Sequence, residues 1–454
     1  MAFIDRQENR EAALGRIRQA LETHQIDQAV ETFLDLHPGD QAEVFDWLNE
    51  DQQAELLLHL DIPATAILFS HQEDDETLQA AETLSLERLA EVLDEMEPDE
   101  AADLLGDLPP EQAAVALEQM EDTQAVLPLL VYPDETAGGR MTTDFVAVSR
   151  TATITKAIDD LRQQEPDSEI FYYIFVVDFN QTLVGVVGLR ELVISQPDTI
   201  IESIMDPEVL LVNAWLDQEE VAQIMSTYDL TALPVVDDEH KLVGVITHDD
   251  IIDVIQEEAT EDILRLANVT DSDLEPDSPV REQLKGRLPW LFLNTVTALF
   301  ASWVISNFED IIAQVAVLAV FQSVVAGQGG NAASQSVAMF VRALALGSLP
   351  SGKTLSLLIR QMFVGLLQGM SVGAVVGIGV YLWKGNPYLG LVLGLALVGN
   401  LILAGIVGTL IPMGLRAIGQ DPAMASSVLV TAVTDSLGFF IFLSLARFFL
   451  PNLI

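Results

Sequence analysis

The last apolar stretch of the sequence, between Pro422 and Ala446, contains a single charged residue, Asp435, near its middle. A carboxylate at the centre of a membrane costs about 2.5–3.5 kcal/mol on insertion scales, so such residues are retained mainly for function. No Lys or Arg in the same stretch can neutralise it. We therefore expect Asp435 to bind a cation. The alternative is a protonated carboxyl group that hydrogen-bonds to a neighbouring helix.

The composition decides which ligands a bound cation can have. The sequence has no cysteine, which excludes disulfides and thiolate sites, and its six histidines show no pair at ligand spacing. Oxygen ligands remain, and these favour hard cations such as Mg²⁺, Ca²⁺ or Mn²⁺. Up to Arg287 the chain has 65 acidic and 15 basic residues. We expect no nucleic-acid partner, because so acidic a surface repels phosphate.

Beyond Arg287 the sequence changes to nearly charge-free stretches that are long enough to cross a membrane. The stretch between Arg287 and Glu309 has 21 uncharged residues, and a helix of about 20 residues spans a hydrocarbon core of about 30 Å. Buried core helices of a soluble protein do not explain several stretches of this length. The sequence therefore predicts five spanning helices, at about 288–308, 312–335, 358–383, 389–414 and 424–448.

The basic residues around these stretches predict their orientation, because cytoplasmic loops are enriched in Lys and Arg. The edges that would face the cytoplasm carry Lys285, Arg287, Arg342, Lys353, Arg360 and Arg416. The opposite edges carry Lys384 and Arg447. The N-terminal residues MAFIDRQENR have no apolar signal-peptide segment. We expect a multi-pass protein of the cell (inner) membrane, with a cytoplasmic N-terminus and the C-terminus outside.

Two repeats organise the acidic first part. Residues from about 25 to 130 repeat short amphipathic phrases (DQAEVFDWL, DQQAELLLHL, DEAADLLGDL, EQAAVALEQM), which predict an α-helical superhelix. VVDFNQTLVGVVGLREL from Val176 aligns with VVDDEHKLVGVITHDDI from Val235, and each copy follows a helical segment. This strand–turn–strand–helix pattern resembles a tandem pair of CBS modules. CBS pairs commonly bind adenine nucleotides such as ATP, and Tyr173 and Arg190 are the candidate contacts. The alternative places Tyr173 in a strand core and Arg190 at a turn cap.

The predicted fold class is multidomain: an α-helical superhelix (1–137), an α/β tandem CBS module (138–200 and 201–263), a connecting helix (264–287) and an all-α five-helix transmembrane domain (288–454). This order resembles the MgtE family of magnesium channels and transporters over nearly the whole chain. Three segments carry the resemblance: EEATEDIL from Glu257, GQGGNAASQS from Gly327, and the last apolar helix from Asp421 to Arg447. Many relatives have Gly-Asn-Gln where this chain has Ala333-Ser334-Gln335, and a proline at Val428.

The resemblance implies a homodimer in the lipid bilayer that moves hydrated Mg²⁺ into the cytoplasm, and no enzymatic activity. Asp435 matches the pore aspartate, and backbone carbonyls near Gly329, Asn331 and Ser427 would complete a ring around the ion. Mg²⁺ gives up its water reluctantly, so a wide ring that reads the hydrated ion suits it.

The resemblance also implies regulatory Mg²⁺ bound to carboxylates, which closes the pore when internal Mg²⁺ is high. The matching positions are Asp99, Asp103, Asp217, Glu219, Asp229, Asp250, Asp253, Glu258, Glu261, Asp262 and Asp421. Two alternatives remain open at this point. One is a broader divalent-cation transporter that also carries Co²⁺ or Mn²⁺, and the other is a membrane receptor whose CBS pair reads a nucleotide.

Overall fold

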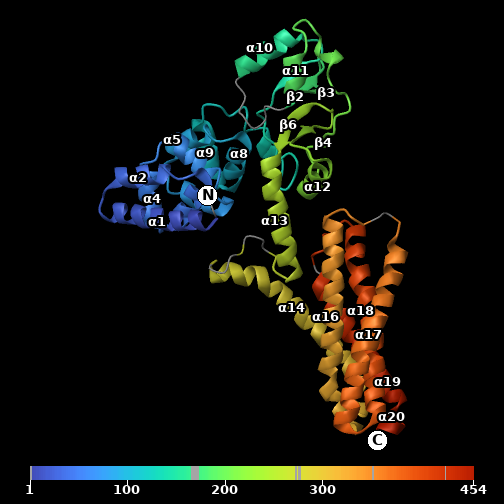
Figure 1. Cartoon of the computed structure of the whole chain (residues 1–454). Helices are drawn as coiled ribbons and strands as arrows, with labels where there is room; N and C mark the ends of the chain where they lie inside the picture. Colours follow the sequence, from blue (N-terminus) through green and yellow to red (C-terminus); the bar gives the residue numbers. More distant parts are fainter. Residues whose placement is uncertain (1–2, 165–172, 271–273, 275–277, 350–351, 425) are drawn as a thin grey trace. The chain divides into compact units, whose positions relative to one another are not determined.

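The computed structural model describes residues 3–164, 173–270, 274, 278–349, 352–424 and 426–454. They fold into two compact units, Met1–Val254 and Ile255–Ile454 (Figure 1). The first contains the helical repeat and both CBS modules, and the second contains the long apolar helices. The predicted succession of a helical part, an α/β part and an all-helical part is confirmed.

The N-terminal part consists of nine short helices packed around one apolar core. They are α1 (Phe3–Glu22), α2 (Ile26–Leu34), α3 (Pro38–Asp46), α4 (Glu50–Leu57), α5 (Ile62–Phe69), α6 (Asp74–Ala81), α7 (Leu86–Leu93), α8 (Pro98–Asp107) and α9 (Pro110–Gln119). Proline begins α3, α8 and α9, and the Asn49 side chain caps α4 by accepting a hydrogen bond from the Gln52 amide. These start signals recur with the repeat, because each copy needs its own first turn satisfied. Phe33, Phe45 and Leu57 are fully buried in the core.

The two CBS modules repeat one another strand for strand. In the first, β1 (Ala147–Ser149) pairs in parallel with β2 (Tyr173–Val177), which pairs in antiparallel with β3 (Leu183–Gly188). In the second, β4 (Val212–Asn213), β5 (Ala232–Val236) and β6 (Leu242–Thr247) pair in the same way. Gly185 and Gly244 occupy the same place in the two sheets, and a Cβ at either would collide with a methionine. The glycine of each Leu-Val-Gly-Val phrase is therefore a packing requirement.

Helices surround these two sheets. The first module contains α10 (Ile154–Gln164) and α11 (Leu189–Ile194), and the second contains α12 (Gln218–Tyr228) and the start of α13 (His248–Leu266). The predicted connecting helix, 264–287, differs from the observed structure. The helix after the second module is α13, which ends before Asn268, a residue with a φ of 62°. Residues 264–287 are therefore not one helix, because this left-handed residue ends α13 and the next helix begins only at Val280.

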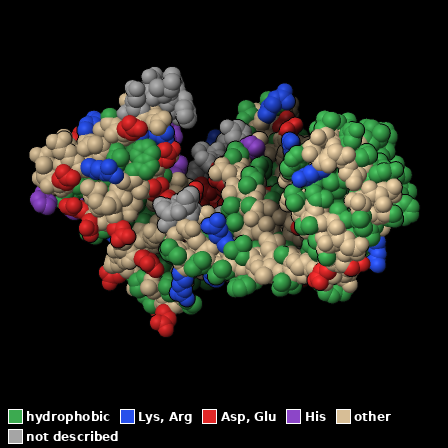
Figure 2. All heavy atoms as spheres, turned by 90° about the horizontal axis from the view of Figure 1, so that it is seen from below, with side chains coloured by type: hydrophobic (Ala, Val, Ile, Leu, Met, Phe, Trp, Pro, Cys, Tyr) green, Lys and Arg blue, Asp and Glu red, His purple; other side chains and the backbone are tan. Residues whose placement is uncertain are grey.

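The second unit is a bundle of long helices. It contains α14 (Val280–Ser306), α15 (Glu309–Gln314), α16 (Val317–Ala345), α17 (Thr354–Lys384), α18 (Pro387–Ala417), α19 (Ser426–Phe448) and α20 (Leu450–Leu453). Hydrophobic side chains dominate its visible surface, whereas acidic side chains are frequent on the helical N-terminal part (Figure 2). In the described residues four helices are long and apolar enough to cross a membrane: α14, α17, α18 and α19.

The second predicted span, 312–335, is not among these four. The structure divides it between α15 and α16, and α16 carries Gln322, Gln328, Asn331 and Gln335, which lower its hydropathy. α16 nevertheless packs against α18 and α19 inside the same unit. The five-span count therefore stays a prediction.

Glycines bring α17 and α18 into close contact. A Cβ at Gly373 would lie 2.6 Å from the Gly394 carbonyl oxygen, and one at Gly377 would lie 2.7 Å from that of Gly390. The spacing of these glycines therefore serves packing, since backbones approach closely where neither helix carries a side chain. α18 also contacts α16 and α19, so it is the central helix of the unit.

Candidate ion pathway and cation-sensing carboxylates

Asp435 lies half-buried in the middle of α19, and α14, α16 and α18 pack against this helix. Among the described residues its carboxylate has no hydrogen-bond or ion-pair partner. Ser427, Thr431 and Asp435 follow one another at intervals of four, so they share one side of α19. The Thr431 hydroxyl donates to the Ser427 carbonyl oxygen at 2.8 Å. The arrangement offers a cation one charged group on the side of α19 that also carries the hydroxyl groups of Ser427 and Thr431.

The two predicted pore positions on α16 do not share a face. Gly329 is buried against Asn400 of α18, and Asn331 is exposed in this single chain. Residues two apart on a helix point about 200° away from one another, so both cannot face the same ion. Asn400 itself was not predicted as a functional residue. Its signal was a lone amide in the most apolar stretch, GLVLGLALVGNLILAGIVG.

Four of the predicted metal-binding carboxylates gather at the end of α13. Arg265 contacts Glu261 on its own helix and Asp421 just before α19. Burial, followed by the charges of Asp421 and Glu258, raises the pKa of Asp262 to about 6. The site is a small acidic cluster that already contains one cation, the Arg265 guanidinium. No role had been predicted for Arg265.

A second polar contact joins the same two segments. The Asn268 side chain donates to the Ser427 hydroxyl at 3.1 Å and accepts from it at 3.3 Å. Ser427 therefore binds the residue that ends α13 through its side chain. The start of α19, the helix that carries Asp435, is thus fixed to the end of α13 within this unit.

Asp99 and Asp250 face one another in the first unit, although they come from the N-terminal helices and the second CBS module. Asp99 on α8 is 6% exposed, and its Oδ1 has no hydrogen-bond partner. Burial, followed by the charge of Asp250, raises the pKa of Asp99 well above its usual value. Burial also raises the pKa of Asp250, although its Oδ2 accepts from the Thr247 hydroxyl at 2.6 Å. A cation between them would offset both the burial and the repulsion.

The charge of Arg140 acts on both Asp103 and Asp253. Burial raises the pKa of Asp103 to about 8, and the Arg140 charge acts against this. Burial and the charge of Asp249 raise the pKa of Asp253. The Arg140 charge acts in the opposite direction here too. Arg140 in turn donates from Nε to Gln218 at 2.9 Å. The structure therefore brings predicted carboxylates of α8 and α13 together, and Arg140, for which no role was predicted, acts on two of them.

The remaining predicted sensing residues have local structural roles and lie apart from one another. Asp217 caps α12 by accepting from the Glu219 amide at 2.9 Å, and Asp229 ends the same helix with a φ of 51°. The ends of an 11-residue helix are about 16 Å apart. A single chain therefore does not bring Asp217 and Glu219 together with Asp229.

Tyr173 and Arg190 lie close together in the first CBS module. Tyr173 is 39% exposed and pairs across the sheet with Gly188, two residues before Arg190. The alternative that places Tyr173 in a strand core is wrong, because this first strand residue faces outward. Both side chains are accessible, as the prediction of a nucleotide contact requires.

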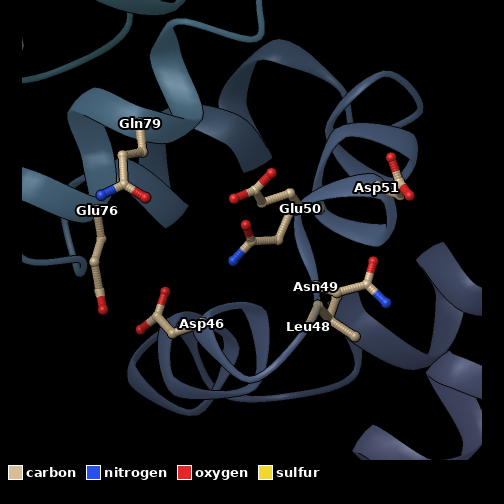
Figure 3. A pocket seen from close by; sticks show the side chains of 8 residues that line it. Asp46, Leu48, Asn49, Glu50, Asp51, Glu76 and Gln79 are labelled. Atoms are coloured by element: carbon tan, nitrogen blue, oxygen red, sulfur yellow. The ribbon is translucent and has the colours of Figure 1, made fainter. Parts of the chain in front are cut away.

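A hollow in the N-terminal helices was not predicted. It has a volume of about 540 Å³, and Asp46, Glu50 and Glu76 contribute carboxylates to its lining (Figure 3). Burial raises the pKa of Asp46, and hydrogen bonds with Glu76 and Gln72 lower it. Across the described residues no three His, Asp or Glu side chains converge as a ready metal site. The carboxylates of one chain therefore meet mainly in pairs.

The raised pKa of Asp103 predicts how the stability of the first unit depends on pH. Between about pH 4 and pH 8 the folded state keeps a proton on Asp103 that the unfolded state has released, so stability falls as pH rises through this window. We expect the unfolding temperature of the detergent-solubilised protein, measured in EDTA, to fall between pH 5 and pH 8.

Two substitutions check that result. Asp103→Asn should flatten the dependence, whereas Glu118→Gln, at an exposed site on α9, should leave it unchanged. An equal slope in all three proteins would contradict the assignment to Asp103.

Comparisons with known proteins agree with these parts of the chain. The model of the family MgtE, described as a divalent cation transporter, matches residues 322–445. That of the MgtE intracellular N domain matches residues 36–135, and that of the CBS domain matches residues 137–197 and 201–257. The predicted CBS pair is thereby confirmed.

Two curated relatives are similar over most of the chain. The magnesium transporter MgtE of Thermus thermophilus is 40% identical over 321 residues, which are 70% of this chain and 71% of that protein. The magnesium transporter MgtE of Enterococcus faecalis is 38% identical over 322 residues, 71% of each chain. A crystal structure of the cytosolic domain of the Mg²⁺ channel MgtE in complex with ATP aligns at a TM-score of 0.50 and 35% identity. It covers 53% of this chain and 99% of that structure.

Proposed function

Since this chain belongs to the MgtE family of magnesium transporters, we propose that it conducts hydrated Mg²⁺ into the cytoplasm and closes when cytoplasmic Mg²⁺ binds its acidic domains. The observation that carries the proposal is Asp435, a carboxylate without a partner among the described residues, in the middle of an apolar helix. Retaining an unneutralised charge at this depth makes sense where an ion passes.

In the proposed pore, two chains of a homodimer contribute one Asp435 each. Two carboxylates around an axis attract a divalent cation strongly, and Mg²⁺ keeps most of its water in such a wide site. α16 is the fifth span in this arrangement, because it has 29 residues and packs against α18 and α19 despite its polar side chains. The N-terminus is then cytoplasmic and the C-terminus outside.

In the proposed regulation, Mg²⁺ binds the closed state better than the open state. Asp99 and Asp250 support this, since their burial and mutual repulsion are relieved by a cation between them. The acidic cluster at the end of α13 supports it too, because Asp421 directly precedes the helix that carries Asp435. When internal Mg²⁺ falls, repulsion separates the carboxylates and the pore opens.

The CBS pair is proposed to bind an adenine nucleotide such as ATP. The similar cytosolic domain was crystallised in complex with ATP, and Tyr173 and Arg190 are both exposed beside the first sheet. A nucleotide there would adjust the response of the first unit to Mg²⁺.

Ion flux into vesicles tests the proposed transport function. The purified protein is reconstituted, and uptake of Mg²⁺, Ca²⁺, Co²⁺ and Mn²⁺ is compared with and without Mg²⁺ on the side of the acidic domains. We expect Mg²⁺ uptake that ceases at millimolar Mg²⁺ on that side. Equal uptake of all four ions would favour a broader divalent transporter, and no uptake of any ion would refute the proposal.

A further inference from the structure

Asn400 is a fully buried polar residue in α18, the central helix of the second unit, with 0% of its surface exposed. Its side-chain amide donates from Nδ2 to the Val325 carbonyl oxygen of α16 at 2.8 Å. Its Oδ1 has no hydrogen-bond partner in the described residues. A buried acceptor without a partner lowers stability, and an apolar residue would avoid this. Its presence therefore indicates a role other than stabilising the bundle.

Two glycines form the slot that holds the Asn400 amide. A Cβ added at Gly438 of α19 would lie 2.8 Å from both Nδ2 and Oδ1. A Cβ added at Gly329 of α16 would lie 2.8 Å from the Asn400 Cγ and still closer to the Asn400 Nδ2. Neither glycine accepts a side chain while the amide stays in place. The amide thus lies between α16 and α19 and is in contact with both.

Both helices carry proposed pore groups next to these contacts. Gly329 belongs to the GQGGN segment of α16, and Gly438 follows Asp435 by three residues on α19. Three residues correspond to a rise of about 4.5 Å and a turn of about 300°, so Asp435 and Gly438 lie on nearly the same side of the helix. Asn400 therefore connects the two segments at nearly the level of the carboxylate.

We propose that Asn400 is a positioning residue: its amide fixes the separation of the α16 glycine segment and the Asp435 helix, and thereby sets the ion affinity and selectivity of the pore. Asn400 does not contact the ion in this proposal. The inference rests on the proposed transport function for its flux readout, but the helix separation can be measured without any flux.

Flux is measured in vesicles for Asn400→Ala, Gly438→Ala and the double variant, each as the full chain. Removing the amide should raise the half-saturating Mg²⁺ concentration about tenfold and reduce the preference for Mg²⁺ over Ca²⁺ similarly. Gly438→Ala should act in the same way by displacing the amide. In the double variant the new methyl group fills the vacated space, so affinity and selectivity should partly recover.

Gly408→Ala is the matched control. It also introduces a collision between α18 and α16, at Ser336, but it lies eight residues from Asn400, about 12 Å along the helix. When Gly408→Ala is combined with Asn400→Ala, the two effects on flux should add, and neither affinity nor selectivity should recover. Additive effects of Asn400→Ala and Gly438→Ala, or wild-type selectivity in a folded Asn400→Ala protein, would overturn the proposal.

The helix separation is measured by placing cysteines for spin labels at Ser334 and Leu437, which are exposed on α16 and α19 in a chain without cysteine. Singly labelled proteins give the distances between chains. Asn400→Ala should change the distance between α16 and α19, and the double variant should restore it.

If this distance changes and is restored as expected, but the wild-type protein shows no Mg²⁺ flux, the positioning role of Asn400 is supported and the transport proposal is refuted. If Asn400→Ala does not assemble, the double variant decides: a wild-type helix distance with partly recovered selectivity is the supporting result, and failure of both overturns the proposal.

Discussion

Asp435→Asn is expected to reduce Mg²⁺ flux more than about 100-fold while expression and assembly stay intact. A carboxylate and a divalent ion about 5 Å apart attract by about 6–7 kcal/mol at an effective dielectric constant of about 20. Losing even half of this lowers ion occupancy more than about 100-fold. Asn keeps the size and the hydrogen-bonding capacity of the Asp side chain, so the loss of flux would be due to the loss of the negative charge. Uptake of Mg²⁺ into vesicles measures it.

Three companion substitutions distinguish an ion-binding role from a structural one. Asp435→Ala should fail nearly as badly as Asp435→Asn, whereas Asp435→Glu should keep some flux with altered selectivity. Asp310→Asn removes an exposed carboxylate that lies 4.0 Å from Arg447 and should leave most of the flux. Near-normal Mg²⁺ transport by a well-folded Asp435→Asn protein would remove Asp435 from the pore.

The second large effect is expected from Asp99→Asn combined with Asp250→Asn. These carboxylates are proposed to bind Mg²⁺ only in the closed state, so their loss should weaken closure and leave conduction intact. We expect the internal Mg²⁺ concentration that halves the flux to rise at least about tenfold. Without Mg²⁺ the double variant should also be more stable than the wild type at pH 8, because the raised pKa of both carboxyl groups disfavours the folded state at that pH.

Glu111→Gln combined with Glu118→Gln is the matched control. It removes the same charge from exposed positions on the neighbouring helix α9. If both double variants responded alike, the general acidity of the first unit would explain the sensing. Closure of the Asp99/Asp250 variant at the wild-type Mg²⁺ concentration would refute the assignment of the pair.

Properties that lie along the chain could be predicted from the sequence. The tandem CBS pattern gave the correct strand pairs because Val176 and Val235 begin the same phrase, and the same register follows in both sheets. Gly373 and Gly377, four residues apart, have the small-residue spacing that is typical of close helix packing, and both lie against α18. Such features depend on hydropathy, repeat and local start signals, which short segments contain in full.

Two other predictions, the connecting helix and the second span, depended on weak or competing local signals; the first was wrong and the second stays a prediction. The connecting helix was predicted to begin where the second CBS module ends, near Asp262. In the structure α13 runs on from that module without a Gly or Pro to stop it and ends just before Asn268. The second apolar stretch is long enough to span a membrane. Its four amide side chains lower the hydropathy of α16, so composition alone does not assign this helix as a span.

By itself the sequence determined the order of the parts, the family and the isolated carboxylate of Asp435, because each of these is written in consecutive residues. Only the tertiary structure decided which side chains meet. Asp99 faces Asp250, the charge of Arg140 acts on both Asp103 and Asp253, and Asn400 fills a slot between two glycines. These contacts join residues far apart in the chain. They depend on which helix faces pack together, and burial there decides whether a carboxylate is an ordinary surface charge or a group whose pKa is strongly raised.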